Sequence, residues 1–435
     1  MKFAFFVHYF PPLNSTGSRR VESFAKYLSR SGHEIVVVST GKSTRDGPLT
    51  EAVPPYIRLY EINSFGRVAK SSGETDRADT QRASSKKRIH WTRRVKQKLM
   101  RLFGQVLDPR IGFPFGIRSR NLDTRVVTEL ASADIFVSSF PPWPAHLAAL
   151  FAQRRFGKPW IADYRDQFSG NHIMNGGWLS DRLELWIDRA LLRRATAVTV
   201  ISGPMKAYYD DMHPCVECIE NGYDGEIFDS AHASLVSSRK SGTTVLRYLG
   251  TITRDRIPVS LLAALERLAA VAPQGEPPFR VEFLGDTRLL EDYVRLRHPN
   301  LLKGWLAFIP AIPYAKSIEA MLSADALFFI ETSDLSNLSA RGVLTTKLFE
   351  YLASGRQIIA EIDNATLTAS YIRQASPIHV VSRDVDTLAA ALRKLCPDTI
   401  KIEDNPFVAS LSRERKAQQF EQFALKVVRR ELGPR

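Results

Sequence analysis

The chain opens with two apolar runs separated by an amphipathic stretch. Residues 2–8 and 33–40 are almost continuously apolar and of strand length, a pattern typical of strands buried on both faces of a sheet. Between them, apolar residues recur at helical spacing over 21–28, and Gly32 ends the predicted helix. Strand, loop, helix and strand predict a βαβ unit. The loop that contains Gly17 then lies at the carboxyl edge of a parallel sheet.

The same alternation continues along the chain. In the first half it predicts further strands at 57–62, 134–140, 157–166, 197–202 and 215–220, with helices at 146–156 and 179–195. After a Ser/Ala-rich linker at 225–243, it predicts strands at 245–250, 279–284, 305–309 and 326–331, each followed by a helix. Residues 407–432 have the pattern of a long amphipathic helix. We expect an α/β protein with doubly wound domains at 1–228 and 243–400, and a C-terminal helix at 405–432.

Composition narrows the protein class. The 435 residues suffice for two domains with ample cores, and 44% hydrophobic and 24% charged residues are ordinary globular values. Three cysteines give no disulfide framework and favour a reducing, cytoplasmic compartment. No apolar run approaches the roughly 18 residues of a spanning helix. The His213–Cys218 stretch would need further ligands for a zinc site, and only Cys396 is left, so we predict no metal site.

Charge is unevenly distributed. The net charge is +14, and residues 1–110 hold 21 Lys and Arg against nine Asp and Glu. Residues 81–101 contain nine basic residues and no acidic one, with apolar residues near helical spacing. This pattern favours a surface helix attracted to anionic lipid. A solvated loop and a nucleic-acid arm are alternatives, although no nucleic-acid module accompanies it. The predicted membrane residues are Lys86, Lys87, Arg88, Trp91, Arg93 and Arg94.

Polar residues follow the predicted strands of the first half. Gly17 permits close backbone approach, and Arg20 can meet an anion. His146 lies just beyond a strand end, where a functional or a structural role is open. Asp163, Arg165 and Asp166 end another strand and suit either the orientation of hydroxyl groups or an internal ion pair.

In the second half, two segments combine glycine with charge. The loop from Gly250 and Thr251 reaches Arg256 near a helix start, and arginine can hold a diphosphate through two hydrogen bonds. Thr345 or Thr346 begins a short helix that Gly355 ends. Lys347 and Glu350 lie one turn apart on it. A helix start suits a phosphate and a nearby carboxylate suits the hydroxyls of a ribose, although a surface helix with a Lys/Glu pair explains the same pattern.

Residues 347–355 (Lys-Leu-Phe-Glu-Tyr-Leu-Ala-Ser-Gly) resemble the donor-binding stretch of family 4 glycosyltransferases of the GT-B fold. Glu350 occupies the position of that family's ribose-binding glutamate. Many members carry a second glutamate eight residues earlier, where this chain has Gly342. Residues 9–20 and 221–224 are similar to other motifs of this family. Residues 141–146 and 160–166 resemble motifs of a subgroup of its bacterial members that build surface polysaccharides.

The resemblance implies two Rossmann-like domains facing a cleft, with the C-terminal helix crossing back to the first. It implies a retaining transfer from a nucleoside-diphosphate sugar, without an obligatory metal or other cofactor, to a lipid-linked or membrane-proximal saccharide, at the inner face of the cytoplasmic membrane. The expected pathway is O-antigen, capsule or exopolysaccharide synthesis.

Each domain is assigned its part of the site. The expected donor-binding residues are Gly250, Thr251, Arg256, Gly342, Val343, Leu344, Thr345, Lys347 and Glu350. The candidate catalytic residues are His146, Asp163 and Asp166, and the acceptor-side residues are Gly17, Arg20 and Arg165.

Two alternatives stay open. A nucleotide-sugar epimerase can have the same architecture, and a membrane adaptor without catalytic activity could use the basic segment alone. The expected partners are the donor, the acceptor and an anionic membrane surface, not nucleic acid. The base, the sugar and the linkage depend on a few contacts that vary freely on one scaffold.

Overall fold

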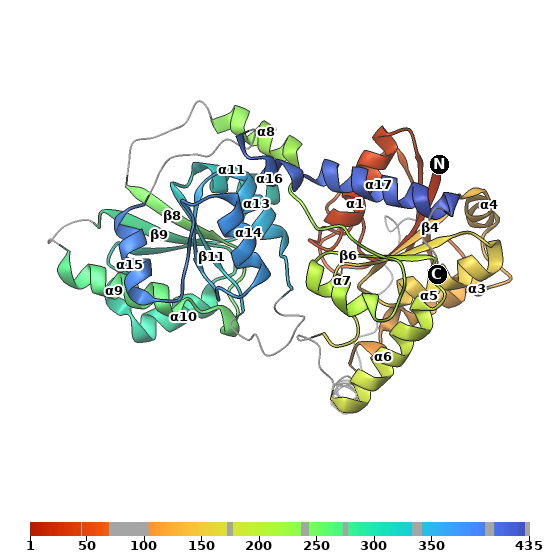
Figure 1. Ribbon diagram of the computed structural model, residues 1–435, viewed down its shortest axis with the longest axis horizontal. Coiled ribbons are helices and arrows are strands. Elements are labelled where there is room, and N and C mark those ends of the chain that lie inside the picture. Colours follow the sequence, from red (N-terminus) through yellow and green to blue (C-terminus); the bar gives the residue numbers. More distant parts are fainter. Residues whose placement is uncertain are drawn as a thin grey trace, which may run out of the picture. The chain divides into compact units, whose positions relative to one another are not determined.

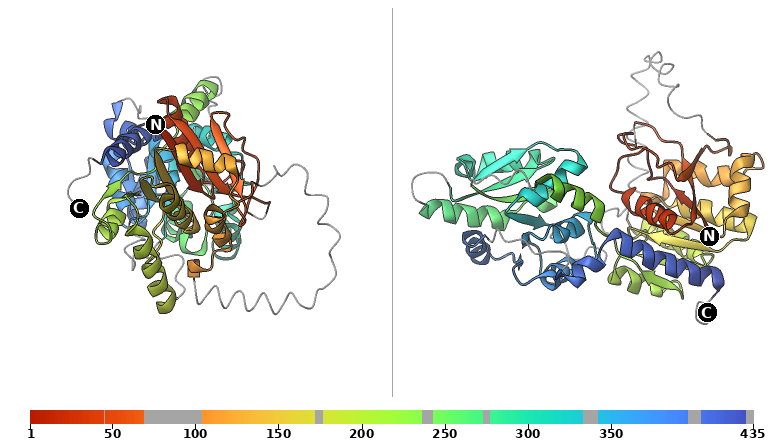
Figure 2. Two further views of the ribbon diagram at one scale, coloured as in Figure 1. Left: turned by 90° about the vertical axis from the view of Figure 1, so that its right-hand side faces the viewer. Right: turned by 90° about the horizontal axis from the view of Figure 1, so that it is seen from above.

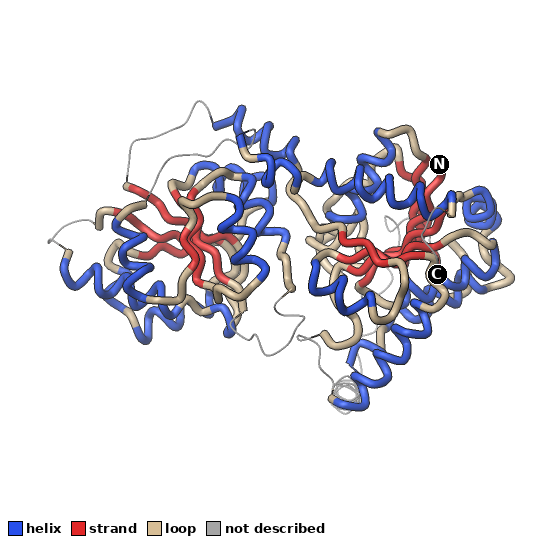
Figure 3. Tube along the Cα trace, viewed as in Figure 1, coloured by secondary structure: helices blue, strands red, loops and turns tan. Residues whose placement is uncertain are grey.

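The computed structural model describes residues 1–44, 46–68, 104–171, 177–235, 243–272, 277–332, 342–395 and 404–430. The chain divides into two compact units. Unit 1 comprises residues 1–220 and 416–435, and unit 2 comprises residues 221–415. In each unit the strands form a central layer with helices on both sides (Figure 3).

The sheet of unit 1 is entirely parallel, with strand order β3-β2-β1-β4-β5-β6-β7. Successive residues of β1 enter opposite cores: Phe3, Phe5 and Val7 face one, and Ala4 and Phe6 face the other. Burial on both faces is why the strand is an unbroken apolar run rather than an alternating one. The strands are β1 (Lys2–Val7), β2 (Glu34–Thr40), β3 (Ile57–Ile62), β4 (Ile135–Phe140), β5 (Trp160–Tyr164), β6 (Ala197–Val200) and β7 (Val216–Cys218).

Two sets of helices cover this sheet (Figure 1). One face carries α3 (Gly112–Arg118), α4 (Thr124–Ser132), α5 (Pro144–Phe156), α6 (Trp178–Leu192) and α7 (Gly203–Asp210). The other face carries α1 (Arg19–Arg30) and α17 (Arg413–Arg429), whose residues from 416 onward belong to unit 1.

Helix α17 completes the core on its side of the sheet. The rings of Phe24 in α1 and Phe420 in α17 stack with centroids 4.4 Å apart, and Ala417, Ala424 and Val427 are buried in the same cluster. The two helices lie side by side in both views of Figure 2. The predicted return of the C-terminal helix to the first domain is confirmed. The predicted single helix is interrupted, because α16 (Pro406–Ser410) ends before α17 begins.

Unit 2 has a second parallel sheet, with strand order β10-β9-β8-β11-β12-β13. Its strands are β8 (Thr244–Leu249), β9 (Phe279–Leu284), β10 (Leu306–Ile309), β11 (Ala326–Ile330), β12 (Gln357–Glu361) and β13 (Val380–Val381). One face carries α9 (Val259–Val271), α10 (Arg288–Arg297) and α15 (Val385–Arg393). The other carries α8 (Gly225–Leu235), α11 (Tyr314–Ser323), α13 (Thr346–Ala353), α14 (Leu367–Ala375) and α16. These two sheets, with the returning helix, are the GT-B fold that the sequence predicts.

The predicted linker at 225–243 is wrong over its first half, because residues 225–235 form α8. Its Ser and Ala residues suggested a linker, but they belong to a helix whose Phe228 and Ala231 are buried in the core of unit 2. The chain enters unit 2 just before this helix. There Tyr223 pairs with the segment that leads out: its N–H donates to the Leu411 carbonyl at 3.2 Å, and its carbonyl accepts from the Arg413 N–H at 2.8 Å.

The Asn221–Asp224 motif serves this pairing. A Cβ on Gly222 would overlap the Leu411 carbonyl oxygen and come within 3.0 Å of the Arg413 nitrogen. Glycine is therefore required for the two segments to pass so closely. Arg413 donates through Nε to the Gly222 carbonyl at 2.9 Å, and its guanidinium lies 3.8 Å from the Asp224 carboxylate.

Candidate donor-binding site and its first-unit counterpart

The strand order of unit 2 reverses between β8 and β11. The chain moves from β8 outward to β9 and β10, then returns to β11 and moves outward on the other side. In doubly wound sheets the loops that follow the two central strands diverge at such a point and leave room for a ligand. Here β8 is followed by Gly250 and β11 by Glu331, and the next described helix after β11 is α13. Most of the predicted donor-binding residues belong to these loops and to α13.

Lys347 and Gly250 are in direct contact at this edge. Gly250 has a φ of +134°, and a Cβ on it would overlap Lys347 Nζ and lie 3.0 Å from Lys347 Cε. The ammonium group also lies 4.2 Å from the ring centre of Tyr248 and donates to its hydroxyl at 3.1 Å. Both the conformation and the close approach require glycine at position 250. Burial, with Arg256 nearby, lowers the pKa of Lys347 to about 7.

Two ionisable side chains near Lys347, those of Glu331 and Arg256, each have one buried polar atom that makes no hydrogen bond to the described residues. Among the described residues, Glu331 Oε1 and Arg256 Nε are buried and have no hydrogen-bond partner. Burial raises the pKa of Glu331 to about 7, although Arg256 and Lys347 partly oppose the shift. Buried polar atoms without partners are uncommon in folded proteins. These two atoms are therefore available to a ligand.

Glu350 is buried and held in place from two directions. Its Oε1 accepts a hydrogen bond of 2.7 Å from the Tyr314 hydroxyl at the start of α11. The next residue, Tyr351, accepts the Leu249 N–H at 2.8 Å and so ties α13 to the end of β8. The Lys-x-x-Glu-Tyr pattern thus places a cation beside Gly250 and a carboxylate near that cation, with a tyrosine that ties the helix to β8.

The other predicted donor-binding positions directly follow Gly250 or directly precede α13. Gly342 and Leu344 are buried, Val343 and Thr345 are half-buried, and Thr251 is exposed. Thr345 is the N-cap residue of α13, and the Val343 carbonyl accepts the Thr368 hydroxyl at 3.2 Å. Unit 2 therefore brings two cations, two carboxylates and a helix start to one sheet edge. This set suits a ligand that has both phosphates and hydroxyls.

Asp163 in unit 1 already has four protein donors. It accepts Arg20 Nε at 3.1 Å and Nη2 at 2.8 Å, the Ser139 hydroxyl at 2.9 Å and the Thr199 hydroxyl at 2.8 Å. Burial opposes its ionisation, but Arg20 and the two hydroxyls outweigh burial and lower its pKa. Arg20 also donates to the Glu220 carbonyl at 3.0 Å. The sequence left two interpretations open for Asp163, the orientation of hydroxyl groups or an internal ion pair. The structure shows an internal ion pair between Asp163 and Arg20.

Arg165 holds the first loop of unit 1 in place. Its guanidinium donates to the carbonyls of Gly17, Pro141 and Phe140, and it lies 5.4 Å from the ring centre of Tyr9. A Cβ on Gly17 would come within 2.8 Å of this guanidinium. Arg165 therefore joins the loops that follow β1 and β4, the strands between which the order of this sheet reverses. Asp166 is exposed beside it.

His146 lies inside the aromatic core of unit 1. Its ring is fully buried, 4.6 Å from the Tyr164 ring centre, and its Nδ1 lies 2.7 Å from the Ser138 hydroxyl. Burial lowers its pKa to about 3, so the imidazole is neutral at pH 7. Its Nε2 has no hydrogen-bond partner among the described residues. The catalytic roles assigned to His146, Asp163 and Asp166 stay predictions.

Comparison with known proteins identifies the first unit. The family described as "Glycosyl transferase 4-like domain" matches residues 15–215. The chain is a GT-B glycosyltransferase. No curated protein matches its sequence.

Solved structures match the glycosyltransferase over nearly its whole length. Sucrose-phosphate synthase from Thermosynechococcus elongatus has a TM-score of 0.62 at 14% identity, with 98% of each chain covered. Anabaena HepE in complex with UDP-glucose has a TM-score of 0.55 at 13% identity, covering 98% of this chain and 100% of that one. UDP-GlcNAc 2-epimerase from Methanocaldococcus jannaschii has a TM-score of 0.52 at 8% identity, covering 98% and 99%. At such identities these likenesses show the fold.

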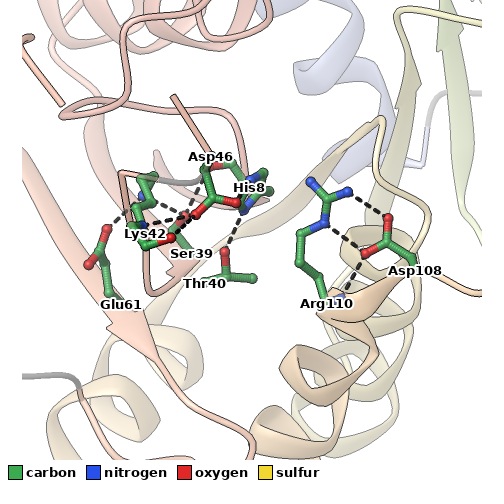
Figure 4. A network of polar contacts seen from close by, with 9 residues as sticks. His8, Ser39, Thr40, Lys42, Asp46, Glu61, Asp108 and Arg110 are labelled. Carbon is green, nitrogen blue, oxygen red and sulfur yellow. Dashed lines mark hydrogen bonds and ion pairs between the residues drawn. The ribbon is translucent and has the colours of Figure 1, made fainter. Parts of the chain in front are cut away.

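Sequence reasoning missed another polar network at the carboxyl edge of the glycosyltransferase's first sheet (Figure 4). His8 Nδ1 lies 2.6 Å from the Thr40 hydroxyl, and Lys42 donates to Glu61 at 2.7 Å. Arg110 pairs with Asp108 at 2.7 Å. Burial, with Arg110 nearby, lowers the pKa of His8 to about 4. His8 directly follows β1, a position that could have drawn attention to it.

In unit 2 of the glycosyltransferase, sequence reasoning missed Tyr248, Tyr314 and Glu331. Each contacts or neighbours the predicted donor-binding residues. Only Glu331 had a usable signal, an acidic residue directly after a buried strand.

The predicted membrane residues lie outside the described residues. Within the part of the chain that the structure describes, no helix is long and apolar enough to cross a membrane, and no three His, Cys, Asp or Glu residues group around a potential metal position.

Proposed function

We propose that this glycosyltransferase moves a sugar, with retention of configuration, from a nucleoside-diphosphate sugar to a lipid-linked or membrane-proximal saccharide in surface polysaccharide synthesis. Unit 2 would hold the donor and unit 1 the acceptor. The observation that carries the proposal is the cluster at the β8/β11 edge, where Lys347 contacts Gly250 and where Arg256 and Glu350 interact electrostatically with Lys347.

Each part of the donor finds suitable chemistry in this cluster. Arg256 and Lys347 supply positive charge for the diphosphate, and Arg256 Nε is a buried donor without a protein partner. A cation there would also stabilise the charge that develops on the leaving diphosphate. Glu350, oriented by Tyr314, has acceptor oxygens that suit the ribose hydroxyls. Binding of UDP-glucose by HepE, which shares the fold, supports a uridine or related nucleotide.

Donor binding tests the proposal directly. UDP-, GDP- and dTDP-sugars would be titrated into the full chain by calorimetry, and at least one should bind. Glu350→Ala should weaken that binding about tenfold or more, because it removes hydrogen bonds to a charged group. Glu291→Ala, which removes a carboxylate paired with Arg295 on α10, is the matched control and should leave the affinity unchanged.

The reaction products separate the remaining possibilities. Donor binding followed by label transfer to material in a membrane extract supports the transferase. An isomerised nucleotide sugar formed without an acceptor would identify an epimerase. An absence of affinity for any nucleotide sugar would overturn the proposal and favour a membrane adaptor without catalytic activity.

A further inference from the structure

Helix α6 exposes a narrow stripe of tryptophan and arginine. Trp178 is 70% exposed and Trp186 is 67% exposed, although tryptophan side chains are on average largely buried in folded proteins. Arg182, Arg189 and Arg193 are also exposed. At 3.6 residues per turn, these five positions fall within an arc of about 80°. They therefore form one face of the helix, here named the Trp/Arg face, and the guanidinium of Arg182 lies 5.1 Å from the ring centre of Trp178.

Two of the three acidic residues of α6 lie on its buried side, and the third, Asp181, is half-buried at the edge of the Trp/Arg face. Glu184 and Asp188 are buried, and Asp188 accepts hydrogen bonds from the hydroxyls of Tyr164 at 2.5 Å and Ser169 at 2.7 Å. Glu184 accepts the Gln105 N–H at 3.1 Å. Since the carboxylates of Glu184 and Asp188 point into unit 1, only Asp181 is near the Trp/Arg face, and its single negative charge leaves the three arginines in excess. Within the described residues, no ion pair involves its three arginines.

The position of α6 leaves this face exposed among the described residues of unit 1. The helix lies at the margin of the unit, and its N-terminal half extends away from the sheet in Figures 1 and 2. Leu179, 47% exposed, adds apolar surface at that end.

This combination matches the chemistry of an anionic bilayer surface. Tryptophan prefers the headgroup level, where its ring is in an apolar environment and its N–H is near water. Arginine binds lipid phosphates through two hydrogen bonds while its methylene groups stay in apolar surroundings. Each basic residue near an anionic membrane strengthens the electrostatic attraction of the protein to that membrane. The net charge of the whole chain, +14, has the same sign.

A second copy of the chain is a poorer occupant. In a twofold dimer each face would meet its own equivalent, so the arginines of one copy would oppose those of the other. Like charges brought together in this way oppose association. Charge complementarity therefore favours an anionic surface over self-association.

We propose that the Trp/Arg face of α6 lies on anionic lipid and brings unit 1 to the membrane. This inference rests on the proposed function only in that a lipid-linked acceptor gives unit 1 a reason to be there. It concerns residues other than those of the basic segment at 81–101, and each set of residues can be tested without the other.

Vesicle binding by the full chain tests the proposal. The chain would be floated with vesicles of phosphatidylglycerol and phosphatidylethanolamine, and with vesicles of phosphatidylcholine alone. It should bind the anionic vesicles preferentially. Trp178→Ser with Trp186→Ser, and separately Arg182→Glu with Arg189→Glu, should each weaken binding about tenfold or more. Leu296→Ser removes an equally exposed apolar side chain (78%) from α10 and should have no effect.

Fluorescence locates the contact. The chain has six tryptophans, of which Trp143, Trp160 and Trp305 are buried. In a Trp91→Phe background, brominated lipid should quench fluorescence, and the quenching should be lost after Trp178→Phe and Trp186→Phe. Vesicle binding that leaves Trp178 and Trp186 unquenched would overturn the proposal. So would self-association that the α6 substitutions abolish, which would mean that this face pairs copies of the chain.

Failure of this inference can be told from failure of the proposed function. None of the substituted residues belongs to the β8/β11 cluster, so nucleotide-sugar binding should be unchanged in every α6 variant. A chain that binds a nucleotide sugar but no anionic vesicle would overturn the membrane surface alone. A chain that binds vesicles through α6 but no nucleotide sugar would overturn the proposed function alone.

Discussion

Lys347 and Glu331 make the charge of the candidate donor site depend on pH near neutrality. Burial places the pKa of each at about 7, lowered for the lysine and raised for the glutamate. Below this pH, Lys347 is charged and Glu331 is neutral. Above it, Lys347 loses its positive charge and Glu331 becomes negative. Both changes disfavour an anionic ligand.

We therefore predict that nucleotide-sugar affinity falls as the pH rises through about 7. The diphosphate of the donor is esterified at both ends and keeps its charge over this range, so the change reports on the protein. Calorimetry from pH 6 to 8.5 would measure it, and binding at the upper end should take up protons.

Substitution assigns the effect. Lys347→Met should weaken binding at low pH and flatten the profile. Arg295→Met, which removes an exposed cation on α10, serves as the control. An affinity that does not change with pH in the wild-type chain would contradict this account of the site.

At the scale of elements, Tyr351 fixes the position of α13 relative to β8. Its hydroxyl is the partner of the Leu249 N–H, and its side chain is fully buried. Tyr351→Phe would leave that N–H buried and unpaired. We predict a loss of about 1–3 kcal/mol in the free energy of unfolding, measured by urea denaturation.

Tyr293→Phe provides the comparison. The hydroxyl of Tyr293 has no hydrogen bond among the described residues, so its removal should change stability by less than about 0.5 kcal/mol. Equal effects of the two substitutions would argue against the anchoring role of Tyr351. Tyr351→Phe should also weaken donor binding, because Lys347 and Glu350 are on the same helix.

The central strands β1, β4, β5 and β11 were predictable because they are runs of apolar residues buried on both faces, so periodicity and length suffice. The first turns of α13 were also readable, from Lys347, Glu350 and the terminating Gly355, whose φ is +66°. Helix α8 could not be predicted, because its Ser and Ala residues resemble a linker and the burial of Phe228 in the core of unit 2 is visible only in the structure. Tyr314 could not be assigned either, since its contact with Glu350 joins residues 36 apart in the sequence.

The side-chain environments of unit 1 were also beyond reach of the sequence. His146 and Asp163 follow or end strands, as ligand-binding residues do, but position along the chain does not tell whether a side chain enters a core. Here the His146 ring packs among aromatic side chains, and the Asp163 carboxylate accepts hydrogen bonds from Arg20, Ser139 and Thr199.

At the scale of the whole molecule, unit 1 is built from both ends of the chain. Phe420 in α17 is fully buried against Phe24, and His33 lies 2.8 Å from Glu421. Phe420→Ala would leave a cavity between α1 and α17. We predict a destabilisation of about 3–5 kcal/mol, measured as a lower midpoint of thermal unfolding. Gln422→Ala, on the exposed side of α17, should leave the midpoint nearly unchanged.

The paired segments at Tyr223 and Leu411 carry the chain into unit 2 and out again side by side. A fragment cut off at Glu220 would accordingly lack α17 and present the apolar side of α1 to water. A version of unit 1 that keeps α17 is made by joining Glu220 to Lys416 through a short connector. These two residues already form an ion pair of 2.7 Å. By the same reasoning, unit 2 is a single continuous insertion, so residues 221–415 could be exchanged for those of a relative as one cassette.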